Sequence, residues 1–435
     1  MNSTRLAGIL SSLTVLLSST VPLRAAEVAV PPFYANAMAT KPEGPVGKVI
    51  AQEAVATAVP HAQAWRIAYI SSDVRERPTI STALVIAPQG AAPDGGRPIM
   101  AWAHGTTGTA QSCGPSQVLD PAQDLNQYFL VGGTSWTDFG VPALSEFIGK
   151  GYVVVATDYQ GLGGGGRHQY AISATQGRDV INSIRAVGSM GLSGQARKAA
   201  VYGWSQGGGA TLSAAGLADY VRKTGTAFDG IEVVGFVAFA PQDVAVMIPK
   251  GALDAAAANA LLQDLAKTFS DNVFNFTHFA MMMWAMAATF PEVELSDLFS
   301  AEGANGLNAI FSKKCMHAAA DTMNFTFGEA YKSFLQQKPA RPEQWVKALV
   351  EGSVAPVKPI APVIIYWGTK DTVVPPAMGQ LYREQMCGMG GNVSRVQLPG
   401  EQTHFSTPGA AKSMYVDWIA DRFAGKQAAD GCKPN

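Results

Sequence analysis

Short apolar segments alternate with amphipathic or alanine-rich segments along most of the chain, and this alternation constrains the fold most strongly. The apolar segments have the length of buried strands, and the segments between them have the length of helices. Parallel strands need long crossovers, usually helical, so the pattern predicts an α/β fold with a mostly parallel sheet covered on both faces. We expect strands at 64–71 and 79–86, which form a hairpin, and at 98–104, 152–158, 199–203, 233–239, 362–367 and 393–398. We expect helices at 144–151, 174–187, 206–221, 377–387 and 410–423.

The alternation is interrupted between residues 242 and 358. Connections in such folds usually have about 2–6 residues, so we interpret 242–358 as a helical cap inserted into a core domain that spans 26–241 and 359–435. The core begins with a proline-containing arm at 26–60. Within the cap we expect helices at 254–269, 276–289, 308–320, 329–337 and 343–351.

Residues 1–25 have the pattern of a secretory signal peptide. One positive charge near the start is followed by an apolar stretch from Leu6 to Val21, and small residues end the segment at Ala25. The alternative is a membrane span, but the stretch contains several serines and threonines and is shorter than the roughly 20 apolar residues that crossing a bilayer needs. We therefore expect a secreted protein, either extracellular or periplasmic.

Charge and cysteine content exclude several classes of function. The 32 Lys and Arg nearly balance the 33 Asp and Glu, and charged residues make up only 15% of the chain, so we expect no nucleic-acid partner. Cys113, Cys315, Cys387 and Cys432 form no C-x-x-C pair, which argues against a metal site, and no motif requires a cofactor. An even number of cysteines in an exported chain indicates disulfides, with three possible connectivities.

The sharpest local motif is Gly203-Trp204-Ser205-Gln206-Gly207. A G-x-S-x-G match alone is weak evidence, but this one directly follows an apolar strand and begins an alanine-rich helix. In that context the serine sits on a tight turn with its hydroxyl exposed, and the glycines avoid collisions between strand and helix. Ser205 is the predicted nucleophile.

A serine hydroxyl needs a base that takes its proton and an acid that orients the base. In strand-turn-helix hydrolases the acid and then the histidine follow the serine along the chain. His404 lies in the loop after the last strand and is the predicted base, whereas His278 and His317 fall on helical patterns in the cap and are interpreted as packing or surface residues. Asp371, in the loop after the preceding strand, is the predicted acid, and Glu401 is the reserve.

Catalysis by a serine also needs donors for the developing oxyanion. The backbone N–H of Gln206, the residue after the nucleophile, is one predicted donor. The second is expected from the loop His104-Gly105-Thr106-Thr107, where we favour the N–H of Thr106 over that of Thr107. His104 is expected to orient this loop.

Residues 161–166 match the dinucleotide-binding pattern G-x-G-x-x-G. That motif must open directly into a helix, whereas a non-helical stretch follows here. We interpret the segment as a flexible loop near the mouth of the site.

Taken together, these motifs resemble an α/β-hydrolase of the secretory lipase family, which includes the yeast lipase A type and bacterial relatives. The resemblance covers most of the chain after residue 25. It is carried by Phe33-Tyr34, Gly47-Lys48-Val49-Ile50, Cys113-Gly114-Pro115-Ser116, Asp158-Tyr159-Gln160-Gly161, the serine motif, the long cap and Gly368-Thr369-Lys370-Asp371. One departure is His104-Gly105-Thr106, which is more similar to the oxyanion loop of bacterial true lipases.

The resemblance implies a secreted lipase or esterase that cleaves apolar acyl esters through an acyl-enzyme. Its partners would be small-molecule or lipid esters, with transient contact to lipid interfaces and no obligate protein partner. One alternative is a prolyl or X-prolyl peptidase of the same fold, which would need a carboxylate pair that the cap lacks. Another is a binding protein on an inactive scaffold, against which the intact Ser205, Asp371 and His404 argue.

The four cysteines are expected to form two disulfides. A segment that carries Cys315 could fold over Cys113, and Cys387 and Cys432 flank the last strand and helix, so we predict these two disulfides, as the resemblance also does.

Met282, Met283 and Met286 lie on a dense apolar helix in the cap. Flexible methionines suit adaptable apolar surfaces, so we expect these three to line an acyl groove above Ser205; the alternative is that the helix fills the core of the cap.

Overall fold

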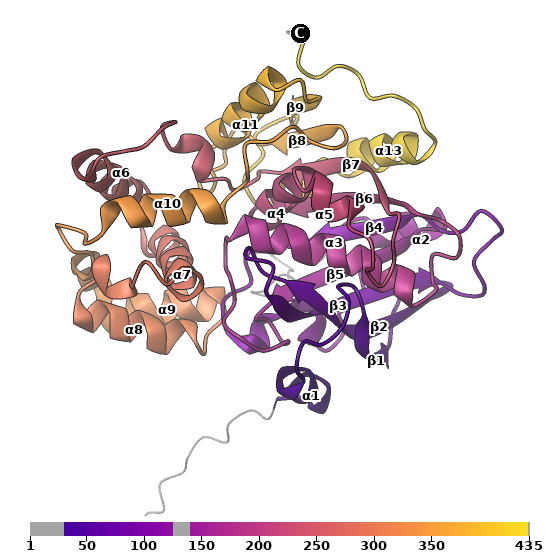
Figure 1. The fold of residues 1–435 in the computed structure, drawn as a ribbon, viewed down its shortest axis with the longest axis horizontal. Helices are drawn as coiled ribbons and strands as arrows, with labels where there is room; N and C mark the ends of the chain where they lie inside the picture. The colour runs from indigo at the N-terminus through magenta and orange to yellow at the C-terminus, as the bar shows by residue number, and fades with distance from the viewer. Residues whose placement is uncertain (1–29, 125–139, 434–435) are drawn as a thin grey trace, which may run out of the picture.

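A computed structural model describes residues 30–124 and 140–433, and the predicted signal peptide lies outside these ranges. Its centre is a nine-stranded sheet with the spatial order β1-β2-β3-β5-β4-β6-β7-β8-β9 (Figure 1). The strands are β1 (Val49–Val55), β2 (Ala62–Ser72), β3 (Pro78–Pro88), β4 (Ile99–Ala103), β5 (Val153–Gln160), β6 (Lys198–Trp204), β7 (Glu232–Phe239), β8 (Val363–Trp367) and β9 (Val393–Gln397).

The sheet is antiparallel at one edge and parallel elsewhere. β1, β2, β3 and β5 pair in an antiparallel manner, and every pair from β5–β4 through β8–β9 is parallel. The strands β4 to β8 are largely apolar and buried, as expected for a sheet covered on both faces. Because parallel strands all end at the same edge, the loops after β4, β6, β8 and β9 lie close together.

Helices cover both faces of the sheet. α3 (Ser173–Ser189), α4 (Gln206–Ala215) and α11 (Ala377–Gly388) pack on one face, and α2 (Leu144–Gly149) and α13 (Lys412–Phe423) on the other. Side chains of β4 alternate between the two resulting cores, with Ala101 in the first and Trp102 in the second. The predicted α/β-hydrolase fold is therefore present.

The segment between β7 and β8, called the insertion below, is mostly helical. Its helices surround a core of their own that continues onto residues of the main domain such as Ile172 and Met378. In Figure 1 they form a separate layer beside the carboxyl ends of the central strands. They are α6 (Ala255–Thr268), α7 (Val273–Thr289), α8 (Ala301–Phe311), α9 (Met316–Phe327) and α10 (Pro342–Gly352).

Several predicted boundaries were wrong. The arm contains α1 (Pro32–Ala39) and β1, and the helix expected at 206–221 ends at Ala215 and resumes as α5 (Ala218–Arg222). The helix expected at 308–320 is two helices, because the chain turns away at 312–315 to bring Cys315 to the main domain. The segment 329–337 forms a short 3-10 helix at Gly328–Phe334, and the last helix is preceded by α12 (Thr407–Ala410).

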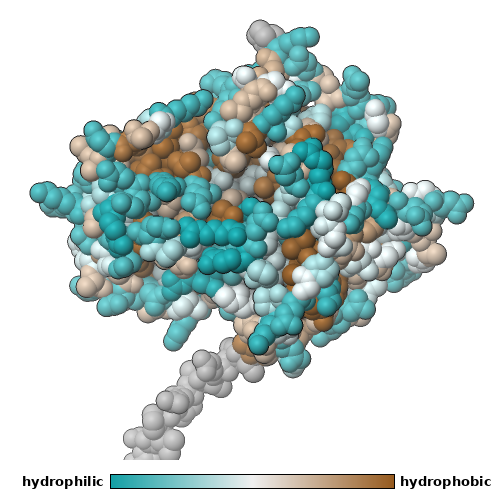
Figure 2. All heavy atoms as spheres, in the orientation of Figure 1, coloured by the Kyte–Doolittle hydropathy of each residue, from teal (hydrophilic) through white to brown (hydrophobic). Residues whose placement is uncertain are grey.

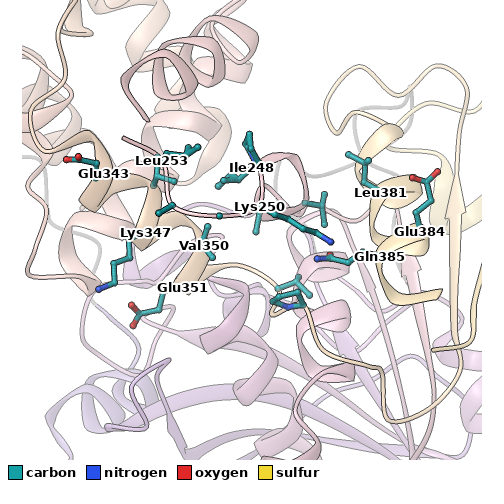
Figure 3. A pocket seen from close by; sticks show the side chains of 18 residues that line it. Ile248, Lys250, Leu253, Glu343, Lys347, Val350, Glu351, Leu381, Glu384 and Gln385 are labelled. Carbon is teal, nitrogen blue, oxygen red and sulfur yellow. The ribbon is translucent and has the colours of Figure 1, made fainter. Parts of the chain in front are cut away.

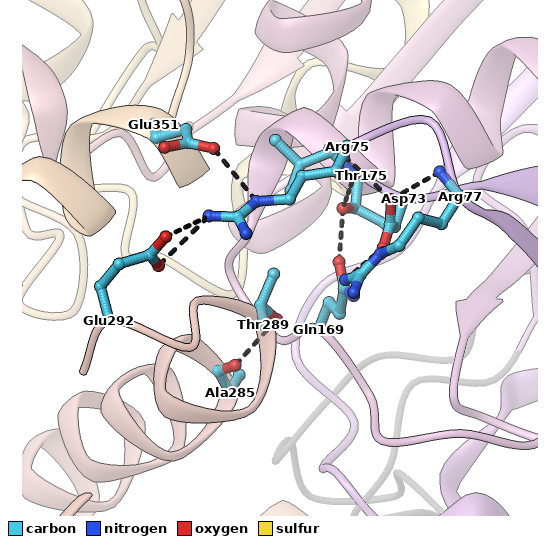
Figure 4. A network of polar contacts seen from close by, with 10 residues as sticks. Asp73, Arg75, Arg77, Gln169, Thr175, Ala285, Thr289, Glu292 and Glu351 are labelled. Carbon is cyan, nitrogen blue, oxygen red and sulfur yellow. Dashed lines mark hydrogen bonds and ion pairs between the residues drawn. The ribbon is translucent and has the colours of Figure 1, made fainter. Parts of the chain in front are cut away.

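An arginine in the turn between β2 and β3 links the main domain to two ends of the insertion. One guanidinium nitrogen of Arg75 lies 3.1 Å from Glu292, just after α7, and its Nε lies 3.6 Å from Glu351 in α10 (Figure 4). Both acidic partners are exposed, so each pair contributes little to stability. None of the helices in the described ranges is long and apolar enough to span a bilayer.

Candidate active site

Ser205 lies on a strained turn between β6 and α4. Its backbone has φ 58° and ψ −117°, a conformation that is costly for a residue with a side chain and that recurs at functional sites. The flanking glycines permit the turn: a Cβ on Gly203 would lie 2.3 Å from the carbonyl oxygen of Gly207, and one on Gly207 would lie 1.9 Å from that of Ala103. The strand-turn-helix context predicted from the sequence is present.

Ser205, His404 and Asp371 form one continuous chain of hydrogen bonds. The Ser205 hydroxyl lies 2.8 Å from His404 Nε2, and His404 Nδ1 lies 2.8 Å from Asp371 Oδ2. The other oxygen of Asp371 accepts the N–H groups of Val373 and Val374, each at 2.9 Å. These backbone bonds hold the carboxylate so that Oδ2 faces the imidazole.

Hydrogen bonds also hold the backbone of His404 in place. Its carbonyl oxygen accepts bonds from the indole N–H of Trp204 and the hydroxyl of Thr407, both at 2.9 Å. Glu401, the reserve acid, is exposed and pairs with Lys370 at 3.3 Å instead of facing His404. Asp371 is therefore the acid that this geometry offers.

The loop after β4 also lies beside the serine. Gly105 is required there because a Cβ would lie 2.4 Å from the ring of Trp204. Thr106 lines a cavity that also contains Ser205 and His404, and its hydroxyl bonds to Tyr170 at 2.9 Å. Thr107 is buried and lines no cavity described around Ser205. Of the two candidates, Thr106 is the one beside the nucleophile.

His104 anchors the start of this loop. Its Nδ1 bonds to the Gly105 carbonyl oxygen at 2.6 Å, and its ring packs 4.5 Å from that of Tyr159. Burial lowers the pKa of His104 to about 4, so the ring is neutral at neutral pH. This environment suits the predicted orienting role.

The same loop is bound to the insertion. Cys113 and Cys315 form a disulfide, and the Thr107 carbonyl oxygen accepts the N–H of Met316, the first residue of α9, at 2.9 Å. A second disulfide joins Cys387, in α11, to Cys432. Both pairs are those predicted from the sequence.

Two narrow cavities open onto Ser205, and the largest cavity among those described does not. One, of about 50 Å³, is lined by Gln206, Phe279 and Met282. The other, of about 20 Å³, is lined by Thr106 and His404. The largest, about 910 Å³, is a groove between α10, the loop at 245–253 and α11. Figure 3 shows aliphatic side chains there, such as Val350 and Leu381, beside charged ones such as Lys250 and Glu384. Figure 2 shows apolar residues around this hollow, but Ser205 does not line it.

The three methionines predicted to line an acyl groove do not share one environment. Met282 lines the cavity beside Gln206, whereas Met283 and Met286 are fully buried in the core of the insertion and line neither cavity at Ser205. α7 is apolar around most of its circumference because it packs against α8, α9 and α10. For Met283 and Met286, the core-filling interpretation is the correct one.

Sequence reasoning missed two histidines at the site. His278, on α7, lines both cavities at Ser205, and His317, on α9, lines the one that contains His404. No local motif distinguishes either from a packing residue, because only the packing of the insertion over the sheet brings them there. Residues 161–166 lie elsewhere: this loop packs against β3 and α1, where a Cβ on Gly164 would lie 2.2 Å from the Ile80 carbonyl oxygen. It lines neither cavity at Ser205, so its predicted place near the mouth is wrong, and its flexibility stays a prediction.

No group of three or more histidine, cysteine or acidic side chains within 30–124 and 140–433 is arranged to hold a metal ion. The arrangement offers instead a hydroxyl, a base, an acid and backbone donors next to small apolar cavities. Such a set can perform nucleophilic acyl transfer without a cofactor.

Comparison with known proteins identifies the family. The family model for secretory lipases matches residues 131–238 and 250–431. The chain belongs to the secretory lipase family. It is thus a hydrolase of the lipase and esterase type, and both family membership and the two disulfides indicate a secreted protein.

Individual relatives are distant but similar along most of their length. Lipase 9 of Candida albicans is 24% identical over 394 residues, which cover 85% of this chain and 75% of the relative. Lipase 4 of the same yeast is 22% identical over 424 residues, covering 92% and 83% of the two chains.

Solved structures share the fold. The crystal structure of Candida antarctica lipase A has a TM-score of 0.66 at 17% identity, covering 93% of this chain and 88% of that one. The rice cell wall degrading esterase LipA from Xanthomonas oryzae has a TM-score of 0.59 at 17% identity, covering 87% and 96%. At these identities the likeness is evidence for the α/β-hydrolase fold alone.

Proposed function

We propose that this lipase-family protein is a secreted serine hydrolase that cleaves apolar carboxylic esters through a covalent acyl-enzyme. The observation that carries the proposal is the hydrogen-bonded chain from Asp371 through His404 to Ser205, with 2.8 Å at each contact. The strained turn at Ser205 and the apolar cavity beside it support the same reading. Its substrates would be small or lipid esters, taken up with transient contact to a lipid surface.

In the first half-reaction, the Ser205 oxygen attacks the ester carbonyl carbon while His404 Nε2 takes the hydroxyl proton. The resulting oxyanion would accept hydrogen bonds from two backbone N–H groups, that of Gln206 at the start of α4 and that of Thr106. Asp371 stabilises the imidazolium, which then gives its proton to the leaving alkoxide. The alcohol departs and the acyl group remains on Ser205.

In the second half-reaction, His404 takes a proton from water as the water oxygen attacks the acyl-enzyme. Collapse of the second tetrahedral intermediate releases the acid, and the proton on His404 returns to Ser205. The acyl chain would extend into the cavity lined by Phe279 and Met282, which offers apolar walls.

The decisive experiment compares the wild type with Ser205→Ala. The wild type should hydrolyse p-nitrophenyl butyrate and be labelled by a fluorophosphonate at Ser205, because only an activated serine reacts with that probe. Ser205→Ala should lose the label and lower kcat by several orders of magnitude, with an unchanged circular dichroism spectrum. Labelling of a different residue, or normal turnover by the folded variant, would refute the proposal; no turnover and no label in the wild type would favour an inactive scaffold.

A further inference from the structure

The two cavities at Ser205 serve different halves of an ester. His404 must reach the leaving oxygen to protonate it, so the alcohol half lies on the His404 side. Only the smaller cavity is lined by His404, together with Phe405 and Trp204, and we call it the alcohol-side cavity. The acyl half is then directed into the other cavity, beside Gln206.

His278 stands where these two cavities meet. Apart from Ser205 and Val373, it is the one residue that lines both cavities. α7 fixes its ring in place: His278 Nδ1 lies 2.9 Å from the carbonyl oxygen of Phe274 one turn earlier, and the two rings meet edge to face at 4.6 Å. The imidazole is therefore held next to the nucleophile.

The hydrogen bond to Phe274 defines the tautomer of His278. A carbonyl oxygen only accepts, so Nδ1 carries the hydrogen, and in the neutral ring Nε2 is an acceptor. Burial lowers the pKa of His278 to about 4, which keeps the ring neutral above that pH. The hydrogen bond to Phe274 uses Nδ1 alone, so Nε2 is the atom that can accept a further hydrogen bond.

Three other polar groups around the alcohol-side cavity are already engaged. The Ser205 hydroxyl bonds to His404, the Thr106 hydroxyl to Tyr170, and the Trp204 indole N–H to the His404 carbonyl oxygen. An acceptor left unpaired in a site is costly once water is excluded, and a ligand that brings a donor removes that cost. The cavity thus favours an alcohol with a donor over an apolar one.

We propose that His278 is a specificity-determining residue that accepts a hydrogen bond from a hydroxyl on the alcohol half of the substrate. The preferred substrates are then esters of alcohols that carry a second, free hydroxyl next to the ester, that is, partially acylated polyols. This inference rests on the proposed function, because it assumes that Ser205 attacks the ester.

The test compares kcat/KM for 2-hydroxyethyl butyrate with kcat/KM for propyl butyrate, two esters of nearly equal size. The wild type should favour the hydroxylated ester about tenfold, the worth of one net hydrogen bond. His278→Phe keeps an aromatic ring but has no acceptor, so the ratio should fall to about one. His278→Gln retains an acceptor and should restore part of the preference.

A matched substrate pair controls for a general effect on the site. Methyl lactate and methyl isobutyrate differ by a hydroxyl on the acyl half, so their ratio should be the same in the wild type and in His278→Phe. If the wild type treats the two butyrates alike, or if His278→Phe preserves the preference, the assignment of His278 is wrong while the proposed function stands. If the wild type hydrolyses none of these esters but turns over p-nitrophenyl butyrate, the assignment of His278 alone is wrong; if it also fails to turn over p-nitrophenyl butyrate and takes no fluorophosphonate label, the proposed function fails as well.

Discussion

Asp371 and Glu401 are the two acids considered as partners of His404, and their surroundings distinguish them. The Val373 and Val374 N–H groups hold one oxygen of Asp371 and leave the other for the imidazole. Glu401 lies closer in sequence but is solvent-exposed and pairs with Lys370. A carboxylate orients a histidine only when the backbone fixes it, so proximity along the chain is a poor guide.

Replacing each acid by its amide separates the two roles. Asp371→Asn keeps the shape but favours the wrong imidazole tautomer, and we expect kcat to fall about 10⁴-fold, as in other serine hydrolases with this triad. Glu401→Gln removes an exposed charge and should change kcat less than about threefold, because an exposed ion pair contributes little. Steady-state kinetics with p-nitrophenyl butyrate decides between them; similar losses in both variants would contradict the assignment of Asp371.

At the residue scale, the sequence was sufficient where chain order dictates geometry. Ser205, Asp371 and His404 could be predicted because each follows a strand of a parallel sheet, and such loops meet at one edge. His278 could not, because it reaches the site through the packing of the insertion rather than through its own strand. Met283 had the same apolar signature as Met282, and only the position of neighbouring helices separates a lining residue from a core residue.

At the scale of elements, α7 contributes to the wall of the cavity beside Gln206 and also forms the centre of the insertion. Its sequence predicts an apolar helix, but a helix that is apolar on all sides does not reveal which side faces the site. The alternation of strands and helices in the main domain was predicted well, because the spacing of apolar residues in the sequence there matches the side chains that the fold buries. The break between α8 and α9 was missed because the disulfide of Cys315, a long-range contact, determines where the chain turns.

Two methionines on α7 provide a matched pair of substitutions. Met282→Ala widens the cavity of about 50 Å³ at its wall, so the ratio of kcat/KM for hexanoyl over acetyl p-nitrophenyl esters should rise roughly tenfold. Met286→Ala creates a hole in the core instead and should lower the free energy of unfolding by about 2–5 kcal/mol with little change in that ratio. Kinetics and urea denaturation measure the two effects, and equal ratios in both variants would show that Met282 does not face the acyl chain.

Asp243 lies where the chain enters the insertion, and the burial of its carboxyl group should make the stability of the protein depend on pH. Its carboxylate accepts the Ala245 N–H at 3.2 Å and interacts with the backbone of Val354, where the chain leaves. Burial raises the pKa of Asp243 from 3.8 to about 7. The folded protein therefore binds this proton more tightly than the unfolded chain, and the stabilisation is lost as pH rises through about 7.

The variant Asp243→Asn lacks this titration. Relative to it, the Tm of the wild type should rise as the pH is lowered from 8 to 5, measured by calorimetry at unit intervals. Asp94→Asn, which removes an exposed carboxylate, serves as the control and should follow the wild type at every pH. A constant difference between wild type and Asp243→Asn would contradict the assignment.

At the scale of the whole molecule, the insertion is fastened to the main domain at points far apart in sequence. Arg75 reaches Glu292 and Glu351 (Figure 4). The disulfide between Cys113 and Cys315 joins the loop after β4 to the start of α9. The exposed ion pairs are weak, so the covalent link is the stronger of these two kinds of contact. It also fixes the segment that follows Thr106, one of the predicted oxyanion donors.

The two disulfides should therefore differ in their effect on catalysis. Each closes a long loop, with sequence separations of 202 and 45 residues, so removing either should cost about 2–4 kcal/mol of stability. The double variant Cys387→Ala/Cys432→Ala should lose only stability, because that bond lies at the end of the chain, away from the cavities at Ser205. The double variant Cys113→Ala/Cys315→Ala should also lower kcat at a temperature where both variants are folded, since the loop that carries Thr106 loses its anchor. Calorimetry and kinetics on the same preparations test this, and equal kcat values for the two variants would show that hydrogen bonds alone, such as that from Met316 to Thr107, hold the loop in place.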